Sequence, residues 1–250
     1  MEFLNILFND LLYRPLFNLL VWIYNVIPGH DFGVAIILLT IIIRLLLFSL
    51  SRSSIETQKV LNELQPKIKE IQEKYKNDKE KQGVALMEIY KKNKVNPFSG
   101  FLAIIIQIPI LIALYKVFLS GFDPEKLNGL YSFIINPGYI NPMFFGIFDL
   151  SKSLPFLAVL AGIFQFIQSK MLMPKKSAQK GKTDNFMSLM SEQMLYMSPF
   201  ITVIFAWKFP GGLALYWTIN TIFSIVQQYL VFQKDKNKDN KYEGNDTKNN

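Results

Sequence analysis

The chain has 250 residues, of which 50% are hydrophobic, and its mean hydropathy is positive at +0.21. Soluble proteins of this size rarely have such a composition, so we expect an all-α integral membrane protein. The absence of cysteine and the single histidine exclude disulfides and thiolate metal sites and argue against a zinc or haem site, so no cofactor is expected. The net charge of +8 comes from lysines clustered in particular loops, which indicates membrane topology rather than DNA binding.

The first segment, residues 3–27, is apolar but contains three residues unsuited to lipid. These are Asp10, Arg14 and Pro15. About a dozen apolar residues follow the proline, fewer than the roughly 20 that a helix needs to cross a bilayer. We therefore predict that residues 1–30 form an amphipathic helix in the extracytoplasmic interface, with Tyr13, Trp22 and Tyr24 near the headgroups. A sixth span is the alternative.

Five later segments are apolar enough to cross a membrane, some of them only just. They cover residues of about 32–51, 97–119, 154–172, 191–207 and 212–233. The fourth is short and contains Pro199, so its limits are open. Together with the loops between them, these five spans form a predicted core over residues 31–233.

Between the first two spans, residues of about 55–95 are predicted to form a helical hairpin outside the membrane. Apolar side chains recur three and four residues apart at Leu61, Leu64, Ile68, Ile71 and Tyr75. This is the spacing of a helical seam. After a turn at Asn77–Asp78, a second stripe consists of Val84, Met87 and Tyr90. Pro66 suits the first turn of a new helix, so we expect the chain to bend near Gln65.

Lysine and arginine are concentrated on one side of the predicted spans. Eleven lie in 52–96, five in 170–190 and five after residue 233, against one in 1–31, two in 120–153 and one in 208–211. Positive residues mark the cytoplasmic side. The N-terminus is therefore predicted outside and the C-terminus in the cytoplasm, with residues 234–250 as a disordered cytoplasmic tail.

Arg44 lies in the middle of the apolar stretch 35–50. A guanidinium near mid-membrane costs from about 3 to more than 10 kcal/mol, and the inner end of the helix is roughly 12 Å away, beyond full reach of the side chain. Lipid phosphates or a buried acid are alternative partners, but the only acid in these spans is Glu192, at a cytoplasmic edge. We therefore predict a water-filled cavity beside Arg44 that opens to the cytoplasm.

Other spans supply isolated polar side chains that can line this cavity. Thr40 precedes Arg44 by one helical turn on the same face. The further candidates are Gln107, Gln165, Gln168 and a stripe of Tyr216, Trp217, Asn220, Ser224 and Gln227. Hydrogen bonding between helices is the alternative for any one of them. Their recurrence in four of five spans, together with Arg44, favours a hydrophilic groove.

Methionine is unevenly distributed, with six of the nine between residues 171 and 197. Met187, Met190, Met194 and Met197 follow helical spacing and would form one cytoplasmic Met-rich face. Flexible thioethers suit the binding of varied apolar segments, and ordinary core packing is the alternative.

The sequence contains no motif for covalent chemistry. A Gly-rich phosphate loop, Gly-x-Ser-x-Gly and His-Glu-x-x-His are all missing, and His30 stands at the outer edge of a span. We therefore expect neither an enzyme nor a small-molecule substrate.

Four stretches together resemble the YidC/Oxa/Alb family of membrane protein insertases. They are "NPFSGFLAIIIQIPILIALYKV" at 96–117, "LQPKIKEIQEKYKNDKEK" at 64–81, "INPMFFGIFDLSKS" at 140–153 and "FPGGLALYWTINTIFSIVQQY" at 209–229. The resemblance runs in the same order from about Tyr13 to Gln233. Within this family the chain resembles the short bacterial form, so we expect no large periplasmic domain.

The resemblance implies a five-transmembrane-helix insertase core in the bacterial cytoplasmic membrane, with a hydrophilic groove open to cytoplasm and lipid. Arg44 falls where the family has its groove arginine, and Thr40, Gln107, Gln165 and Trp217 are implied as groove lining. Implied partners are nascent membrane proteins and the lipid bilayer, with the ribosome, the signal recognition particle pathway and the Sec translocon as candidates. A solute transporter or channel and a structural membrane assembly factor are the alternative functions.

Overall fold

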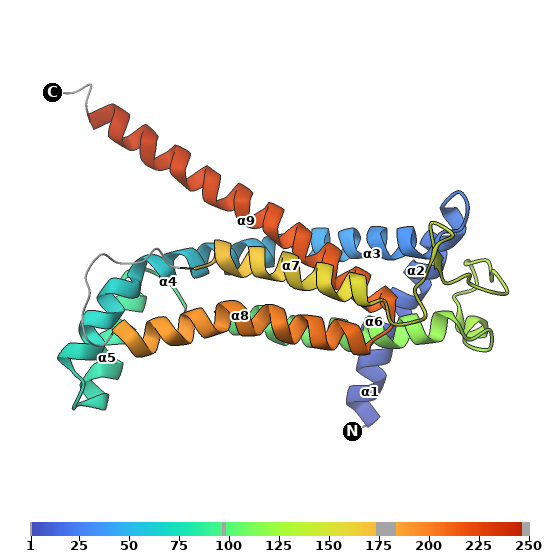
Figure 1. Cartoon of the computed structure of the whole chain (residues 1–250), viewed down its shortest axis with the longest axis horizontal. Helices are drawn as coiled ribbons and strands as arrows, with labels where there is room; N and C mark the ends of the chain where they lie inside the picture. The colour runs from blue at the N-terminus through green and yellow to red at the C-terminus, as the bar shows by residue number, and fades with distance from the viewer. Residues whose placement is uncertain (1, 97–98, 174–183, 247–250) are drawn as a thin grey trace. The chain divides into compact units, whose positions relative to one another are not determined.

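The chain folds mostly as helices (Figure 1) in a computed structural model that describes residues 2–96, 99–173 and 184–246. The helices are α1 (Glu2–Phe8), the π-helix η1 (Asn9–Tyr13), α2 (Arg14–Val26), α3 (Phe32–Leu46), α4 (Phe48–Lys74), α5 (Lys79–Lys92), α6 (Ser99–Gly121), the 3₁₀ turn η2 (Lys126–Gly129), α7 (Pro155–Met171), α8 (Asp184–Lys208) and α9 (Gly211–Asp246). Two short strands, β1 (Met143–Phe144) and β2 (Phe148–Asp149), pair antiparallel. The prediction of an all-α fold is confirmed.

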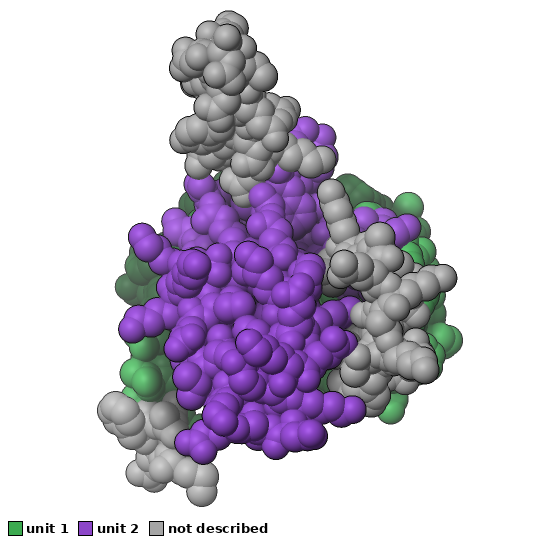
Figure 2. All heavy atoms as spheres, turned by 90° about the vertical axis from the view of Figure 1, so that its left-hand side faces the viewer, with its two compact units in different colours: residues 1–47, 104–166, 196–223 green, residues 48–103, 167–195, 224–250 purple. Residues whose placement is uncertain are grey.

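Two compact units make up the structure, coloured green and purple in Figure 2. Unit 1 contains residues 1–47, 104–166 and 196–223. Unit 2 contains residues 48–103, 167–195 and 224–250. Most of the helices that the sequence predicted as spans contribute residues to both units.

Unit 1 has an apolar core built from α2, α3, α6, α7, α8 and α9 and from the connection between α6 and α7. On α3 the buried side chains recur at helical spacing and are Phe32, Ala35, Ile36, Leu39 and Ile43. Two glycines let neighbouring elements approach closely. A Cβ on Gly33 would overlap the ring of Phe144, and a Cβ on Gly162 of α7 would overlap Val203 of α8.

The helices before α3 are packed more deeply than the sequence suggested. Tyr24, predicted near the headgroups, is 5% exposed, and its hydroxyl accepts the N–H of Asn141 at 3.0 Å. Tyr13 is half-buried and donates to Ser120 Oγ at 2.9 Å. Trp22 is exposed. The residues Asn5–Val26 also form one continuous helical stretch that is long and apolar enough to cross a membrane. Both the interfacial helix and its alternative, a sixth span, therefore stay predictions.

The first predicted span is interrupted at Leu47, which separates the end of α3 at Leu46 from the start of α4 at Phe48. No new helix begins near Gln65, because α4 continues through Pro66 to Lys74, and a bend at this point stays a prediction. A proline removes only one backbone hydrogen bond from a helix, and the rest of the ladder can keep it continuous. Taken together, α3 and α4 satisfy the length and composition of one broken span.

The remaining apolar helices among the described residues are shorter than a full span. They are Ile105–Gly121, Pro155–Met171 and Leu195–Lys208. The predicted limits of the second, third and fourth spans lie within a few residues of α6, α7 and the C-terminal part of α8. The number of five crossings therefore stays a prediction.

Unit 2 contains the predicted hairpin, formed by α4 and α5. On α4, Leu64 and Ile68 of the predicted seam are buried. Asp78 caps α5 by accepting the N–H of Lys81 at 3.0 Å. The predicted stripe on α5 does not pack inward, because Val84 and Met87 are 57% and 58% exposed.

The last helix extends further than the composition indicated. Residues from 234 onward were predicted to be disordered, whereas α9 continues to Asp246. Adding a residue to an existing helix avoids the nucleation step, so a polar segment can continue a helix that it could not start.

Candidate functional site

The predicted groove residues lie on four helices of unit 1. Arg44 occupies the last turn of α3, Gln107 the first half of α6 and Gln165 the second half of α7. Thr40 lies one turn before Arg44 on α3, and Tyr216, Trp217 and Asn220 lie within five residues of one another on α9. The apolar packing of these helices brings part of this set together.

A hydrogen bond joins α6 to α9 in the middle of this region. Gln107 Nε2 donates to the hydroxyl of Tyr216 at 2.7 Å, and Tyr216 is only 2% exposed. A buried phenol needs such a partner, since leaving it unpaired would cost roughly 1–3 kcal/mol. For these two residues the structure thus contains the helix-to-helix bond that was the alternative to groove lining.

Arg44 lies close to the same pair. Its guanidinium carbon is 5.3 Å from the centroid of the Phe223 ring on α9, and the group is within electrostatic range of Tyr216. The side chain is half-buried. Contact with an aromatic face offsets part of the desolvation of the guanidinium. The structure therefore brings the Arg44 guanidinium within electrostatic range of the bonded Gln107–Tyr216 pair, and these three residues form the polar cluster of unit 1.

Thr40 is fully buried in the observed conformation. It is 0% exposed, and its hydroxyl donates to the carbonyl of Ile36 at 2.7 Å within the same helix. This local bond satisfies the hydroxyl without any external group. Thr40 therefore has no exposed surface in the observed conformation, and its role as groove lining stays a prediction.

Gln165 belongs to a separate contact between α7 and α8. Its Nε2 is 3.4 Å from Ser198 Oγ, a long hydrogen bond, and both residues are half-buried. Gln168 is also half-buried and falls in unit 2. On α9, Trp217 and Asn220 are half-buried as well, and the carbonyl of Trp217 accepts a bond from Thr221.

Two further predicted residues, Ser224 and Gln227, fall in unit 2. Gln227 is 2% exposed and donates from Nε2 to the carbonyl of Phe48, the first residue of α4, at 3.0 Å. Its neighbour Gln228, which the sequence analysis did not single out, is equally buried. The side-chain oxygens of both glutamines have no hydrogen-bond partner in the described part of the chain, so this polar site suits bound water.

Most of the predicted Met-rich face cannot be located. Met187, Met190 and Met194 belong to α8, but their side chains lie outside the described residues. Met197 is described and is 54% exposed.

One contact of Arg44 gives no signal in the sequence. Phe223 is one helical turn beyond Asn220 and lies on the same stripe of α9, but an aromatic residue in an apolar helix gives no polar signal. Across the described residues, no group of three or more His, Asp or Glu side chains has the arrangement of a metal site. The site consists of hydrogen-bonding and electrostatic groups set in an apolar bundle.

An apolar helical bundle with an internal arginine defines the chain as a helical integral membrane protein. Residues 22–239 match the sequence profile of the 60Kd inner membrane protein family. The chain belongs to this family, which places it in a bacterial inner membrane.

Curated relatives agree over nearly the whole chain. The membrane protein insertase YidC of Fusobacterium nucleatum is 31% identical over 225 residues, covering 89% of this chain and 98% of the relative. Those of Vesicomyosocius okutanii and Syntrophobacter fumaroxidans are 36% and 38% identical, covering 90% and 87% of this chain. The chain spans 37% of the length of these two longer relatives.

A solved structure has the same fold. It is described as an active YidC insertase crystal structure with the first transmembrane domain resolved. The match has a TM-score of 0.57 at 25% sequence identity and covers 89% of this chain and 46% of the other. The relatives are thus named for a role in membrane insertion, which involves no covalent chemistry.

Proposed function

We propose that this chain is a membrane protein insertase and chaperone that helps newly made membrane proteins to insert, fold and assemble. Membership of the 60Kd inner membrane protein family supports this function. The observation that carries the mechanism is the cluster of Arg44, Gln107 and Tyr216 inside an apolar bundle. No catalytic residue, cofactor or metal takes part in the proposed activity.

Insertion requires moving a polar segment of the substrate across hydrocarbon, where each unsatisfied backbone or charged group costs several kcal/mol. A groove open to cytoplasm and lipid shortens this dry distance. In our proposal, Arg44 attracts acidic residues of the translocating tail, and the amide and phenol of Gln107 and Tyr216 exchange their mutual bond for bonds to the tail. The apolar helix of the substrate stays beside lipid throughout.

We propose the predicted orientation as well, with the N-terminus outside and the C-terminus in the cytoplasm. The distribution of lysine and arginine supports it, because unit 2 carries most of the basic loops. The membrane potential then assists the export of negative tails by about 2.3 kcal/mol per charge per 100 mV.

The α4–α5 hairpin is proposed to receive nascent chains or targeting factors of the signal recognition particle pathway, near the ribosome or the Sec translocon. A surface hollow of about 650 Å³ on α5 supports this role, since it exposes Val84 and Met87 beside Glu88 and Lys91. A photocrosslinker at Met87 should attach to ribosome-bound nascent chains. Equal labelling at Gly129, in the loop after α6, would contradict the role.

The proposed function is tested by reconstituting the chain in vesicles and measuring protease protection of single-span substrates with acidic or neutral N-tails. Arg44→Ala should lower insertion of the acidic-tailed substrate about tenfold, equivalent to about 1.4 kcal/mol, and change the neutral one less than twofold. Arg44→Lys should retain most activity, because the charge is kept.

Lys116→Ala is the matched control, since Lys116 is an exposed cation on α6 that lies over Phe8, away from the predicted groove residues. It should leave both substrates unchanged. Normal insertion of acidic tails by Arg44→Ala would show that the groove charge is not used. If the unmodified chain inserts neither substrate better than empty vesicles, the insertase proposal itself is wrong.

A further inference from the structure

The connection between α6 and α7 exposes apolar side chains on a segment without charge. No Asp, Glu, Lys or Arg occurs between Lys126 and Asp149. Five large side chains of this segment are strongly exposed, namely Phe133 (77%), Ile135 (80%), Tyr139 (59%), Phe145 (66%) and Ile147 (70%). Exposed apolar surface of this extent marks an interaction site.

The segment is held firmly by side chains of α2 and the start of α3. Asn18, which is 2% exposed, accepts the N–H of Tyr131 at 2.7 Å, and Asn25 donates to the carbonyl of Ile135 at 2.7 Å. Further along, Asp31 accepts the N–H of Phe145. The exposed side chains therefore stand on an anchored frame rather than on a free loop.

The turn between β1 and β2 presents one of these residues at a conformational cost. Phe145 and Gly146 both have positive φ, 50° and 67°, and the turn closes with Ile147 N–H bonded to Phe144 O at 3.0 Å. A bulky residue is rare in this region of backbone space. The ring of Phe145 stacks on Phe144 with centroids 4.2 Å apart but stays mostly exposed.

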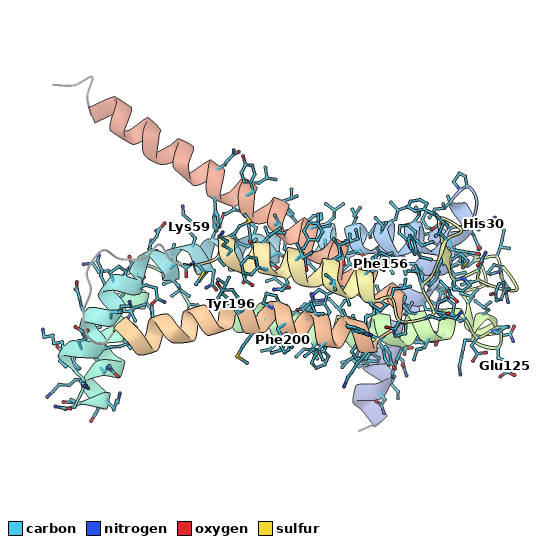
Figure 3. All side chains as sticks on the ribbon, in the orientation of Figure 1. His30, Lys59, Glu125, Phe156, Tyr196 and Phe200 are labelled. Carbon is cyan, nitrogen blue, oxygen red and sulfur yellow. The ribbon has the colours of Figure 1, made fainter. Side chains whose placement is uncertain are left out.

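The exposed segment adjoins an exposed apolar face on α2. Asn25, which bonds to Ile135, belongs to the last turn of α2, where Trp22 and Val26 are 48% and 61% exposed. Tryptophan is enriched at membrane–water interfaces, with its ring at headgroup level. Figure 3 shows His30 and Glu125 at this same end of unit 1.

We propose that the segment between η2 and β2 dips into the headgroup–acyl boundary of the bilayer and forms one lipid-binding belt with α2. Its composition fits this zone, because the exposed side-chain NH2 group of Asn141 can bond to water and headgroups while Phe133 and Phe145 reach the acyl chains. The absence of charge favours lipid over a protein partner, whose interface would have a polar and charged rim. The inference goes beyond the proposed insertase function and depends only on residence in a membrane.

The test uses site-directed spin labels, which the absence of native cysteine makes simple. Phe133→Cys and Phe145→Cys report on the segment, with Ile135→Cys and Ile147→Cys as substitutes if either variant fails to fold. Glu125→Cys is the water-exposed control, and Ile105→Cys, on an exposed α6 position, is the lipid-exposed control. Each labelled chain is reconstituted in phosphatidylethanolamine–phosphatidylglycerol vesicles.

The surroundings of each label are measured by its collision rates with two reagents. Oxygen concentrates in acyl chains, whereas a nickel chelate stays in water. We expect an oxygen-to-nickel ratio at Phe133 and Phe145 at least threefold above that of Glu125 and close to that of Ile105. A ratio equal to that of Glu125 would show a loop in water. Exclusion of both reagents would show cover by a protein partner or a second copy, and either result overturns the proposal.

Discussion

At the scale of single residues, several predicted groove residues make contacts within unit 1 in the observed conformation. Gln107 bonds to Tyr216, Thr40 bonds to its own helix, and Arg44 lies over Phe223. A groove that accepts a polar chain must therefore exchange some of these contacts. Such an exchange requires that each bond be weak. Hydrogen bonds between membrane helices average about 0.6 kcal/mol, which meets this requirement.

The strength of the Gln107–Tyr216 bond can be measured with a double-mutant cycle of Gln107→Leu and Tyr216→Phe. We expect a coupling energy of about 0.6 kcal/mol, and below about 1.7, from unfolding titrations in mixed micelles. The single Gln107→Leu change should destabilise more than the double change, because it leaves a buried hydroxyl unpaired. A coupling of zero would show that the two groups do not bond in the membrane.

Arg44 and its surroundings also show what sequence reasoning can reach at this scale. An arginine in an apolar stretch is conspicuous, and helical spacing relates it to Thr40. The burial of Thr40 and the contact with Phe223 depend on how α3 meets α9, which no local pattern encodes. Polar residues that are predicted to line a groove can equally well bond to one another. Only the three-dimensional arrangement distinguishes groove lining from bonding between helices.

At the scale of elements, a helix boundary can be predicted from the sequence where a residue such as a capping aspartate starts or stops the helix through its own local bonds. Asp78 was predicted as part of a turn and caps α5. The break at Leu47 could not be predicted, because its neighbours Leu46 and Phe48 are ordinary helix residues and no glycine or proline is nearby. The β1–β2 turn also escaped prediction, since its positive-φ position holds Phe145 instead of the expected Asn or Asp.

The cap of α5 should respond to pH. The backbone bond from Lys81, followed by the bond from the Lys81 side chain, lowers the pKa of Asp78 below its ordinary value of 3.8. Because the folded-state pKa is depressed, the stabilising effect is complete above that value and is lost as the pH falls through the folded-state pKa. Protection of the first α5 amides against hydrogen exchange, corrected for intrinsic rates, should be constant from pH 7 to 5 and decline below pH 4.

Asp78→Asn is the matched control for this effect, since asparagine can cap a helix without titrating. Its protection should not change over the same pH range, whereas Asp78→Ala should lose protection at every pH. A decline below pH 4 in the asparagine variant would assign the effect to another group.

The packing of α7 against α8 depends on Gly162. Gly162→Leu should destabilise the protein by about 1–3 kcal/mol, because the new side chain overlaps Val203 and forces the helices apart. Thermal unfolding in detergent measures the loss. Gly83→Ala, on α5 with nothing within 4 Å of the new Cβ, should be neutral or slightly stabilising. Equal stability of both variants would contradict the close contact of α7 and α8.

At the scale of the whole molecule, composition and motif order were sufficient for the fold class and the family. Half of the residues are hydrophobic, and the motifs follow one another in the order of the family. The number of crossings is less accessible to sequence reasoning. Asn5–Val26 is long enough to span, whereas several helices predicted as spans are short, and a short apolar helix can cross only if the bilayer thins or its flanking residues reach outward.

The central claim is that the polar cluster of Arg44, Gln107 and Tyr216 meets the hydrophilic end of another chain during insertion. Photocrosslinking from Trp217, beside Tyr216 on α9, tests it most directly, with Ile108 on the exposed face of α6 as the matched control. We predict adducts between Trp217 and the polar N-tail of ribosome-bound substrates, and adducts between Ile108 and lipid or apolar segments only. Absence of tail adducts at Trp217, while the same chain inserts the substrate, would contradict the account.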